Sequence, residues 1–297
     1  MKDARKIADR ATVYRGSITE PHRWDALRPR EGDVVLATPA KSGTTWTQTM
    51  MAMLLNGTTE LPEKLSIMSP WIESNFSNLD DDLAALERQP GRRVIKTHTP
   101  ADGWPIWDGV PVVMCFRHPM EVFLSLRKHL ANAKVVDEHP LLDPVEASLP
   151  HFLDRTFDPD EIDRDGLETI VAFFTRSVLG DRVPHKLVLN YAGISRDHEG
   201  TVRALDQFLG TAASEALIAD ITRATEFGAM KVKAADFAPE AANDIWHDEQ
   251  KFFAGGRSGA WADDFTDDLI ALYDARFAAL LPDPAHRRWI ETGLGDV

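Results

Sequence analysis

One stretch near the start of the chain constrains the fold more than any other. Residues Asp33 to Thr38 form an apolar run, and a loop containing lysine, glycine and hydroxyl side chains follows it at once. From Thr44 the apolar residues recur with the spacing of one helical face, on Trp46, Met50, Met53 and Leu54. A buried strand, a short loop and a helix predict the first unit of an α/β domain.

Three further strands are predicted along the chain, with helical patterns between them. The strands are expected at Arg93–Thr97, Val110–Phe116 and Lys186–Tyr191, and helices at 121–129 and 167–179. This alternation predicts a single α/β domain whose central, mostly parallel sheet is flanked by helices, an architecture like that of P-loop NTPases. Nothing divides the chain 1–297 into two domains.

Two segments, 134–165 and 231–257, depart from this alternation. The first carries Pro140, Pro144, Pro150 and Pro159, many acidic residues and weak periodicity, with a short helix expected near 145–153. The second ends in a glycine-rich stretch. We interpret both as surface excursions that could act as lids over a site.

Charge and hydropathy exclude several classes of protein. The chain has 33 Lys and Arg against 47 Asp and Glu, a formal charge of −14, which argues against a general nucleic-acid binder. It contains no apolar stretch near the ~18 residues of a membrane span and no signal-peptide core, so a cytoplasmic protein is expected. The single cysteine, Cys115, lies in an apolar run and is expected to be a small buried residue.

The loop after the first strand has the chemistry of a phosphate site. Free N–H groups at a helix N-terminus attract anions, and the loop adds Lys41, Gly43 and three hydroxyls. It is not a Walker A loop, because Lys41 precedes the glycine instead of following it. Taken alone, the loop could also be a solvated helix cap.

The run Lys41-Ser42-Gly43-Thr44-Thr45-Trp46 resembles the 5′-phosphosulfate loop of the cytosolic sulfotransferase family. That family uses 3′-phosphoadenosine 5′-phosphosulfate (PAPS) as sulfuryl donor. The resemblance extends over roughly residues 14 to 266 and implies that all six residues of the loop bind the donor.

Two more motifs follow in the family's order. Lys96-Thr97-His98 resembles the segment whose histidine is the general base, a role suited to a group that titrates near neutral pH. Arg117, with Ser125 eight residues later, resembles the 3′-phosphate site. The resemblance implies catalytic roles for Lys41, Lys96, His98 and Ser125. We interpret the neighbouring 127–129 as a solvated helix face.

The remaining motifs are individually weaker. Tyr191 resembles a nucleotide-contacting tyrosine, and Thr225, Phe227 and Met230 resemble an adenine-binding segment, with Trp46 and Phe227 against the two faces of the ring. Near the C-terminus a further donor motif is matched only in part, by its glycines, which include Gly256, and by Trp261. Ala254 and Gly255 stand where the family has Arg and Lys, and we predict that Arg257 substitutes for them. The family's dimerisation motif is missing, so the oligomeric state stays open.

The predicted function is sulfuryl transfer from PAPS to a hydroxyl or amine of a small, lipophilic or phenolic acceptor, leaving adenosine 3′,5′-bisphosphate (PAP). Tyr14 and Trp71 are predicted to wall the acceptor beside His98. No His, Cys or Asp cluster has metal-ligand spacing, so no metal is expected, and neither nucleic acid nor membrane is an expected partner. Two alternatives stay open: a catalytically silent PAPS- or PAP-binding protein, and a P-loop kinase.

Overall fold

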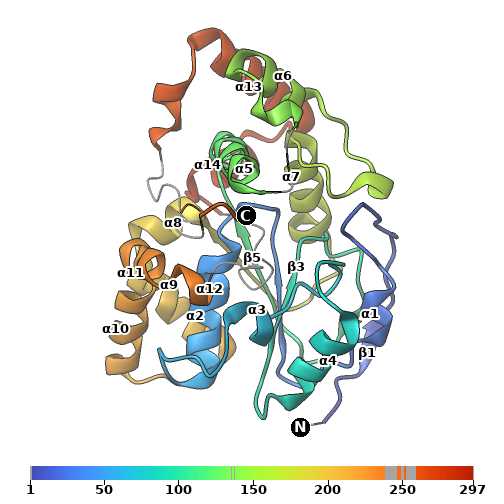
Figure 1. The fold of residues 1–297 in the computed structure, drawn as a ribbon, viewed down its shortest axis with the longest axis vertical. Helices are drawn as coiled ribbons and strands as arrows, with labels where there is room; N and C mark the ends of the chain where they lie inside the picture. The colour runs from blue at the N-terminus through green and yellow to red at the C-terminus, as the bar shows by residue number, and fades with distance from the viewer. Residues whose placement is uncertain are drawn as a thin grey trace.

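Four parallel strands form the central sheet of the computed structural model, which describes residues 2–134, 136, 138–237, 246–248, 251 and 259–296. The strands are β2 (Val34–Ala37), β3 (Val94–Thr97), β5 (Val112–Phe116) and β6 (Lys186–Asn190), in the order β3-β2-β5-β6 (Figure 1). The four predicted strands and their parallel arrangement are therefore confirmed. A separate antiparallel pair joins β1 (Lys6–Ala8) to β4 (Ile106–Trp107).

Both faces of the sheet are buried, which explains why its strands read as continuous apolar runs. Val34 and Leu36 of β2 belong to one core, and Val35 and Ala37 to the other, because successive side chains of a strand point to opposite faces. Cys115 is buried as predicted, and burial raises the pKa of its thiol to about 12.

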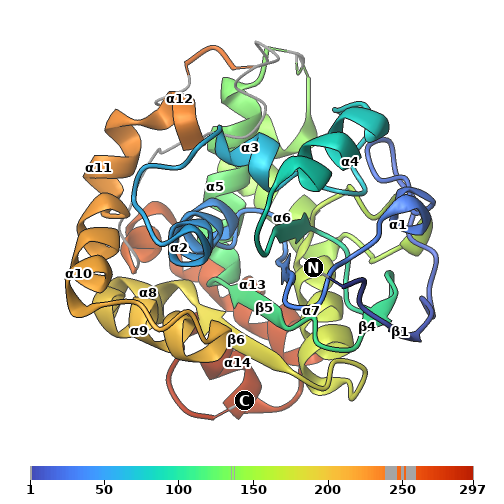
Figure 2. The ribbon, with the colours of Figure 1, turned by 90° about the horizontal axis from the view of Figure 1, so that it is seen from below.

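Helices cover the two faces, with α9 and α10 on one side and α7 on the other (Figure 2). The first side comprises α2 (Thr44–Asn56), α3 (Leu65–Met68), α8 (Tyr191–Arg196), α9 (His198–Leu209), α10 (Glu215–Ala224), α11 (Phe227–Val232) and α12 (Ala234–Phe237). The other comprises α1 (Arg23–Ala26), α4 (Leu79–Arg88), α5 (Pro119–Asn132), α6 (Val145–Asp154), α7 (Leu167–Phe174), α13 (Asp267–Leu280) and α14 (Pro284–Thr292). No helix among the described residues is long and apolar enough to cross a membrane.

Several element boundaries differ from the sequence prediction, two of them in kind as well as in length. Tyr191 begins α8 instead of ending the strand, because the Asn190 side chain accepts hydrogen bonds from the next two free N–H groups and so caps the helix. The helix predicted over 167–179 is α-helical only to Phe174, and Thr175–Leu179 continue it as a π-helix, η3.

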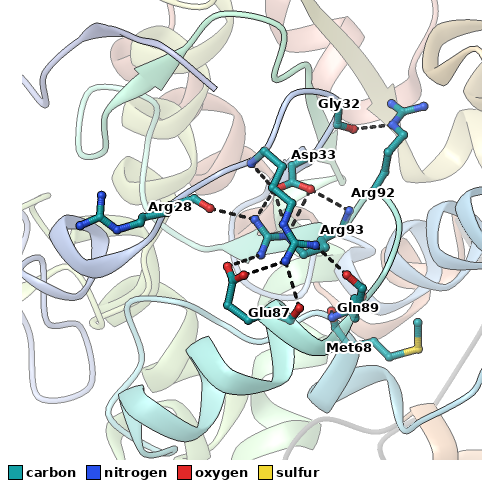
Figure 3. Close-up of polar contacts among 9 residues, drawn as sticks. Arg28, Gly32, Asp33, Met68, Glu87, Gln89, Arg92 and Arg93 are labelled. Atoms are coloured by element: carbon teal, nitrogen blue, oxygen red, sulfur yellow. Dashed lines mark hydrogen bonds and ion pairs between the residues drawn. The ribbon is translucent and has the colours of Figure 1, made fainter. Parts of the chain in front are cut away.

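The polar residue that opens the first apolar run has a structural partner. Asp33 and Arg93 precede β2 and β3 and form a bidentate ion pair, with Arg93 Nη2 2.6 Å from Asp33 Oδ2 (Figure 3). Both side chains are fully buried, and Glu87 and the carbonyl of Arg28 accept the other guanidinium protons. Paired in this way, the two charges join the amino ends of neighbouring strands.

The opposite, carboxyl edge of the sheet is where the topology leaves room for a ligand. From β2 the chain proceeds to β3 on one side, whereas from β5 it proceeds to β6 on the other. Open α/β sheets bind ligands at such a reversal, outside the carboxyl ends of the strands. The loops that follow β2 and β5 therefore bound the expected site.

Candidate active site

A cavity of about 1510 Å³ lies at this edge. Because the strands are parallel, the predicted motifs that follow them meet there: Lys41 after β2, His98 after β3, Arg117 after β5 and Tyr191 after β6 all line the cavity. Residues from 136 to 165 line it from the side. The four strand ends thus bring together residues spread over 150 positions of sequence.

The loop after β2 has an unusual backbone. Gly43, the N-cap of α2, has φ +96°, and a Cβ there would lie 3.0 Å from the Tyr191 ring. Lys41 also has a left-handed backbone, with φ +60°, which is unfavourable for a residue with a side chain. Such strain persists where the surroundings enforce it, often at functional sites. The first-turn N–H groups of α2 open next to this lysine, as an anion site requires.

His98 is held as a neutral base. Its Nδ1–H donates to the carbonyl of Thr38 at 2.8 Å, which leaves the lone pair on Nε2. Burial, with Lys96 and Lys41 nearby, lowers the pKa of His98 to about 3. The ring therefore carries no proton on Nε2 at neutral pH and can accept one.

Trp71 and Lys96 lie directly beside this histidine. The rings of Trp71 and His98 meet edge to face, with centroids 4.7 Å apart, and Lys96 Nζ lies 5.1 Å from the Trp71 ring centroid. All three line the cavity, Trp71 and His98 being the residues predicted for the acceptor side and Lys96 the one predicted for the sulfuryl oxygens.

Glu73 positions the base, a role that the sequence prediction missed. Its Oε1 accepts hydrogen bonds from the Thr97 hydroxyl at 2.6 Å, the His98 N–H at 2.8 Å and the Thr99 hydroxyl at 3.1 Å. The side chain is fully buried, and burial raises its pKa. One carboxylate oxygen thus holds three consecutive residues of the loop. The only signal in the sequence was its place two residues after Trp71.

His129 is a second residue that the sequence prediction misjudged. Its Nδ1 lies 3.0 Å from Lys41 Nζ, and the ring lines the cavity instead of a solvated helix face. Burial and the nearby lysines lower the pKa of His129 well below its usual value, so the ring is neutral and its Nδ1 accepts a hydrogen bond from the Lys41 ammonium group. Of the segment 127–129, only Lys128 is exposed.

Arg117 is oriented by an acidic residue on the next helix. Its Nε donates to Glu121 Oε2 at 2.8 Å, and its guanidinium lies 4.2 Å from the Tyr191 ring centroid. The Gly259 N–H donates to the other oxygen of Glu121 at 2.6 Å. Ser125 lines the same cavity. The predicted phosphate-binding arginine is therefore fixed in place, and Glu121 was not predicted.

The residues predicted to hold the adenine gather at one end of the cavity. Trp46 Nε1 donates to the carbonyl of Thr225 at 2.8 Å, and its ring meets Tyr191 at a centroid distance of 5.2 Å. Phe227 and Met230 line the same end, and Phe227 is partly exposed. Aromatic rings held in place by hydrogen bonds to the backbone can pack against the flat faces of a purine.

Three predicted residues do not join this set. Tyr14 is fully buried and does not line the cavity, because its hydroxyl donates to Asp102 at 2.8 Å and accepts from Arg176. We therefore withdraw it as an acceptor wall. Gly256 and Arg257 lie outside the described residues. Among the residues that are described, no group of three His, Cys, Asp or Glu could hold a metal ion.

Acid should destabilise this region through His118. Its Nδ1 accepts the Met120 N–H and caps α5, and burial lowers its pKa to about 4. Below its unfolded pKa of about 6.5 the unfolded chain binds a proton that the folded chain does not, so the free energy of unfolding should fall by about 2 kcal/mol between pH 7 and pH 5.

Urea denaturation of His118→Asn at the two pH values checks this contribution, because asparagine keeps a capping acceptor without titrating. The variant should lose about 2 kcal/mol less than the wild type between pH 7 and pH 5. Exposed His185→Asn is the control and should behave like the wild type. Equal pH dependence in wild type and His118→Asn would refute this account of the cap.

Comparison with known proteins decides the family. Residues 31–284 match the sulfotransferase domain. A glycolipid sulfotransferase of Mycobacterium tuberculosis (strain ATCC 25177 / H37Ra) is 30% identical, over 99% of this chain and 98% of its own. The chain belongs to the sulfotransferase family. The family predicted from residues 41–46 is thereby confirmed.

More distant sulfotransferases share its fold. Sulfotransferase 1E1 of Bos taurus is 22% identical over 89% of this chain and 88% of its own. The crystal structure of mouse sulfotransferase SULT7A1 complexed with PAP superimposes with a TM-score of 0.70 at 20% identity, covering 91% of this chain and 92% of that one. The predicted fold class is confirmed by this likeness.

Proposed function

We propose that this sulfotransferase transfers the sulfuryl group of PAPS to a hydroxyl group of a small acceptor. The observation that carries the proposal is His98, a neutral histidine with its Nδ1 proton committed to Thr38, which lines one cavity with Lys41 and Arg117. A base, a cation for the leaving group and an oriented cation for a phosphate are what this reaction needs.

The residues divide the cavity into a donor part and an acceptor part. The N-terminus of α2 with Lys41 would hold the 5′-phosphosulfate, Arg117 and Ser125 the 3′-phosphate, and Trp46 and Phe227 the adenine. The solved neighbour SULT7A1 carries PAP, which supports this donor. When bound, PAPS would supply the sulfuryl group.

The chain's own residues then accept the proton of the acceptor and stabilise the negative charge that develops during transfer. His98 Nε2 accepts the proton of the acceptor hydroxyl while the hydroxyl oxygen forms a bond to sulfur. The bond between sulfur and the bridging oxygen breaks, and the bridging oxygen leaves with the phosphate. Lys41 stabilises the negative charge that develops on the bridging oxygen, and Lys96 the charge on the sulfuryl oxygens. Ser125 contributes a hydroxyl donor near the phosphate. Glu73 keeps His98 in register.

The segment 134–165 is proposed as the cover of the acceptor part. Val136, Leu141 and Ile162 line the cavity, and Arg127 of α5 donates to the carbonyl of Asp143 at 2.7 Å, which attaches the segment to the sheet-side helices. The corresponding proposal for 231–257 rests on Trp246, which packs against His129 with ring centroids 4.6 Å apart. The cytoplasmic location stays a prediction.

The proposal is tested by incubating the protein with PAPS and an acceptor panel of phenols, steroids and alkyl glycosides, with sulfated product detected by mass. PAP, at a hundred times its Kd, should stabilise the fold by about 2.7 kcal/mol, measured as a thermal shift against ATP–Mg²⁺.

The outcomes separate the alternatives. Stabilisation by PAP without product from any acceptor would favour a silent binding protein. A response to ATP–Mg²⁺ alone would favour a P-loop kinase. The end of β5 already disfavours the kinase, because Arg117 and His118 stand where a Mg²⁺-binding acid is expected.

A further inference from the structure

The acceptor part of the cavity is lined by polar as well as apolar side chains. Trp71, Phe76 and Phe173 contribute aromatic surface, but His151, Arg155 and Asp165 of the segment 134–165 line the same space. Covering such groups with a purely apolar molecule would remove them from water without a partner, which is unfavourable. The lining suits an acceptor that has both an apolar part and several polar groups.

Two carboxylates that line the cavity, those of Asp163 and Asp165, differ in their hydrogen bonds to the rest of the fold. Asp163 is committed to the fold: its Oδ2 accepts from the N–H groups of Ile18 at 2.6 Å and Thr19 at 3.1 Å, and its Oδ1 from the Thr19 hydroxyl at 2.6 Å. A Cβ on Gly16 would collide with it. Asp163 therefore joins the N-terminal segment to the cavity wall, and most of its acceptor capacity is used within the fold.

Asp165 lines the cavity but takes no part in that network. Within the described part of the chain its carboxylate makes no hydrogen bond or ion pair, and nearby Arg155 donates instead to Glu161 at 3.2 Å. Burial and the adjacent Asp163 raise the pKa of Asp165 to about 7, while Lys41 and Arg155 lower it. A half-buried carboxyl group within electrostatic reach of Lys41 thus lines the same cavity as His98.

The surrounding charges indicate which group Asp165 would bind. Lys41 and Lys96 line the same cavity and would repel a cationic amine on the acceptor, whereas they do not disfavour a neutral hydroxyl. A hydroxyl can donate to the ionised carboxylate or accept from its protonated form, so it is a partner in either state. One acceptor hydroxyl is already assigned to His98.

We propose that Asp165 hydrogen-bonds a second hydroxyl of the acceptor, so that the enzyme selects polyhydroxylated acceptors such as the sugar ring of an alkyl glycoside. The inference rests on the proposed function for the placement of the first hydroxyl. It adds a specificity-determining residue from the segment 134–165, which lines the same cavity. A site that hydrogen-bonds a substrate hydroxyl discriminates strongly against molecules that lack it.

The test measures binding, which does not depend on turnover. Octyl glucoside below its micelle concentration and n-octanol, which share the alkyl chain, are titrated calorimetrically into the PAP-saturated wild type, Asp165→Leu and Asp165→Asn. Asp143→Leu, an exposed position on the same segment, is the matched control. Product formation from PAPS with each ligand is recorded in parallel.

Asp165→Leu should weaken octyl glucoside binding about 10- to 100-fold and should not weaken n-octanol binding, because leucine keeps the branched heavy-atom shape of aspartate but not the acceptor oxygen. Asp165→Asn should recover part of the affinity, and Asp143→Leu should match the wild type. Equal weakening of both ligands, or no weakening of octyl glucoside, overturns the proposal. Selective, Asp165-dependent binding would uphold it even if no acceptor of the panel gave sulfated product, the outcome that would refute the proposed function.

Discussion

Replacing His98 by alanine should lower kcat for sulfuryl transfer by about 10²- to 10⁴-fold, the contribution of a well-placed general base. The acceptor hydroxyl is a weak nucleophile until its proton is removed, and the neutral Nε2 of His98 is placed to remove it. Affinity for PAP should change little, because the histidine serves the acceptor part of the cavity. Steady-state kinetics and PAP titration measure the two effects separately.

His98→Asn is the matched variant for this experiment. Its side-chain amide can still donate to the carbonyl of Thr38, so the loop held by Glu73 keeps its anchor while the base is lost. We expect it to be as inactive as His98→Ala and as stable as the wild type. Turnover within about threefold of the wild type in both variants, well short of the expected loss, would remove His98 from the mechanism.

Replacing Lys41 by alanine should damage both donor binding and chemistry. Loss of a charge-assisted contact should weaken PAP binding about 10-fold or more, and loss of charge stabilisation on the leaving group should lower kcat about 10²- to 10³-fold. Lys41 lies at the N-terminus of α2, 3.0 Å from His129, so no neighbouring lysine occupies the same place. Titration calorimetry and single-turnover transfer provide the two readouts.

Backbone strain must be separated from loss of charge in this experiment, because Lys41 has φ +60°. Lys41→Gly removes the same charge but relaxes the left-handed backbone, so it should be at least as stable as the wild type and equally impaired in transfer. Exposed Lys64→Ala should leave both readouts unchanged. Normal kcat in Lys41→Gly would show that the ammonium group is not needed.

Much of the donor site could be predicted because its residues follow strands. Residues 41–46, His98, Arg117 and Tyr191 each stand after a run that the sequence shows to be buried, and the carboxyl ends of parallel strands lie on one edge. Local order along the chain therefore determined which side chains meet. The same argument could not place Tyr14, whose segment is not next to a strand of the main sheet and whose hydroxyl turns to Asp102.

The residues that support and shape the site required the tertiary structure. Glu73 and Glu121 act through hydrogen bonds to His98 and Arg117, and in sequence they are ordinary acidic residues. Asp163 and Asp165 are two positions apart, have the same side chain and both line the cavity, yet only Asp163 is hydrogen-bonded to the N-terminal segment.

The sequence alone thus determined the sheet, the order of its strands along the chain and the place of the loop that we propose binds phosphate, because hydrophobic periodicity and short-range motifs encode them. Only the tertiary structure decided that His98 is neutral with Nε2 unprotonated, that His129 contacts Lys41 and that Asp165 lines the cavity with no hydrogen bond to another described residue. Protonation and partnership depend on burial and on neighbours distant in sequence, and folding alone brings those together.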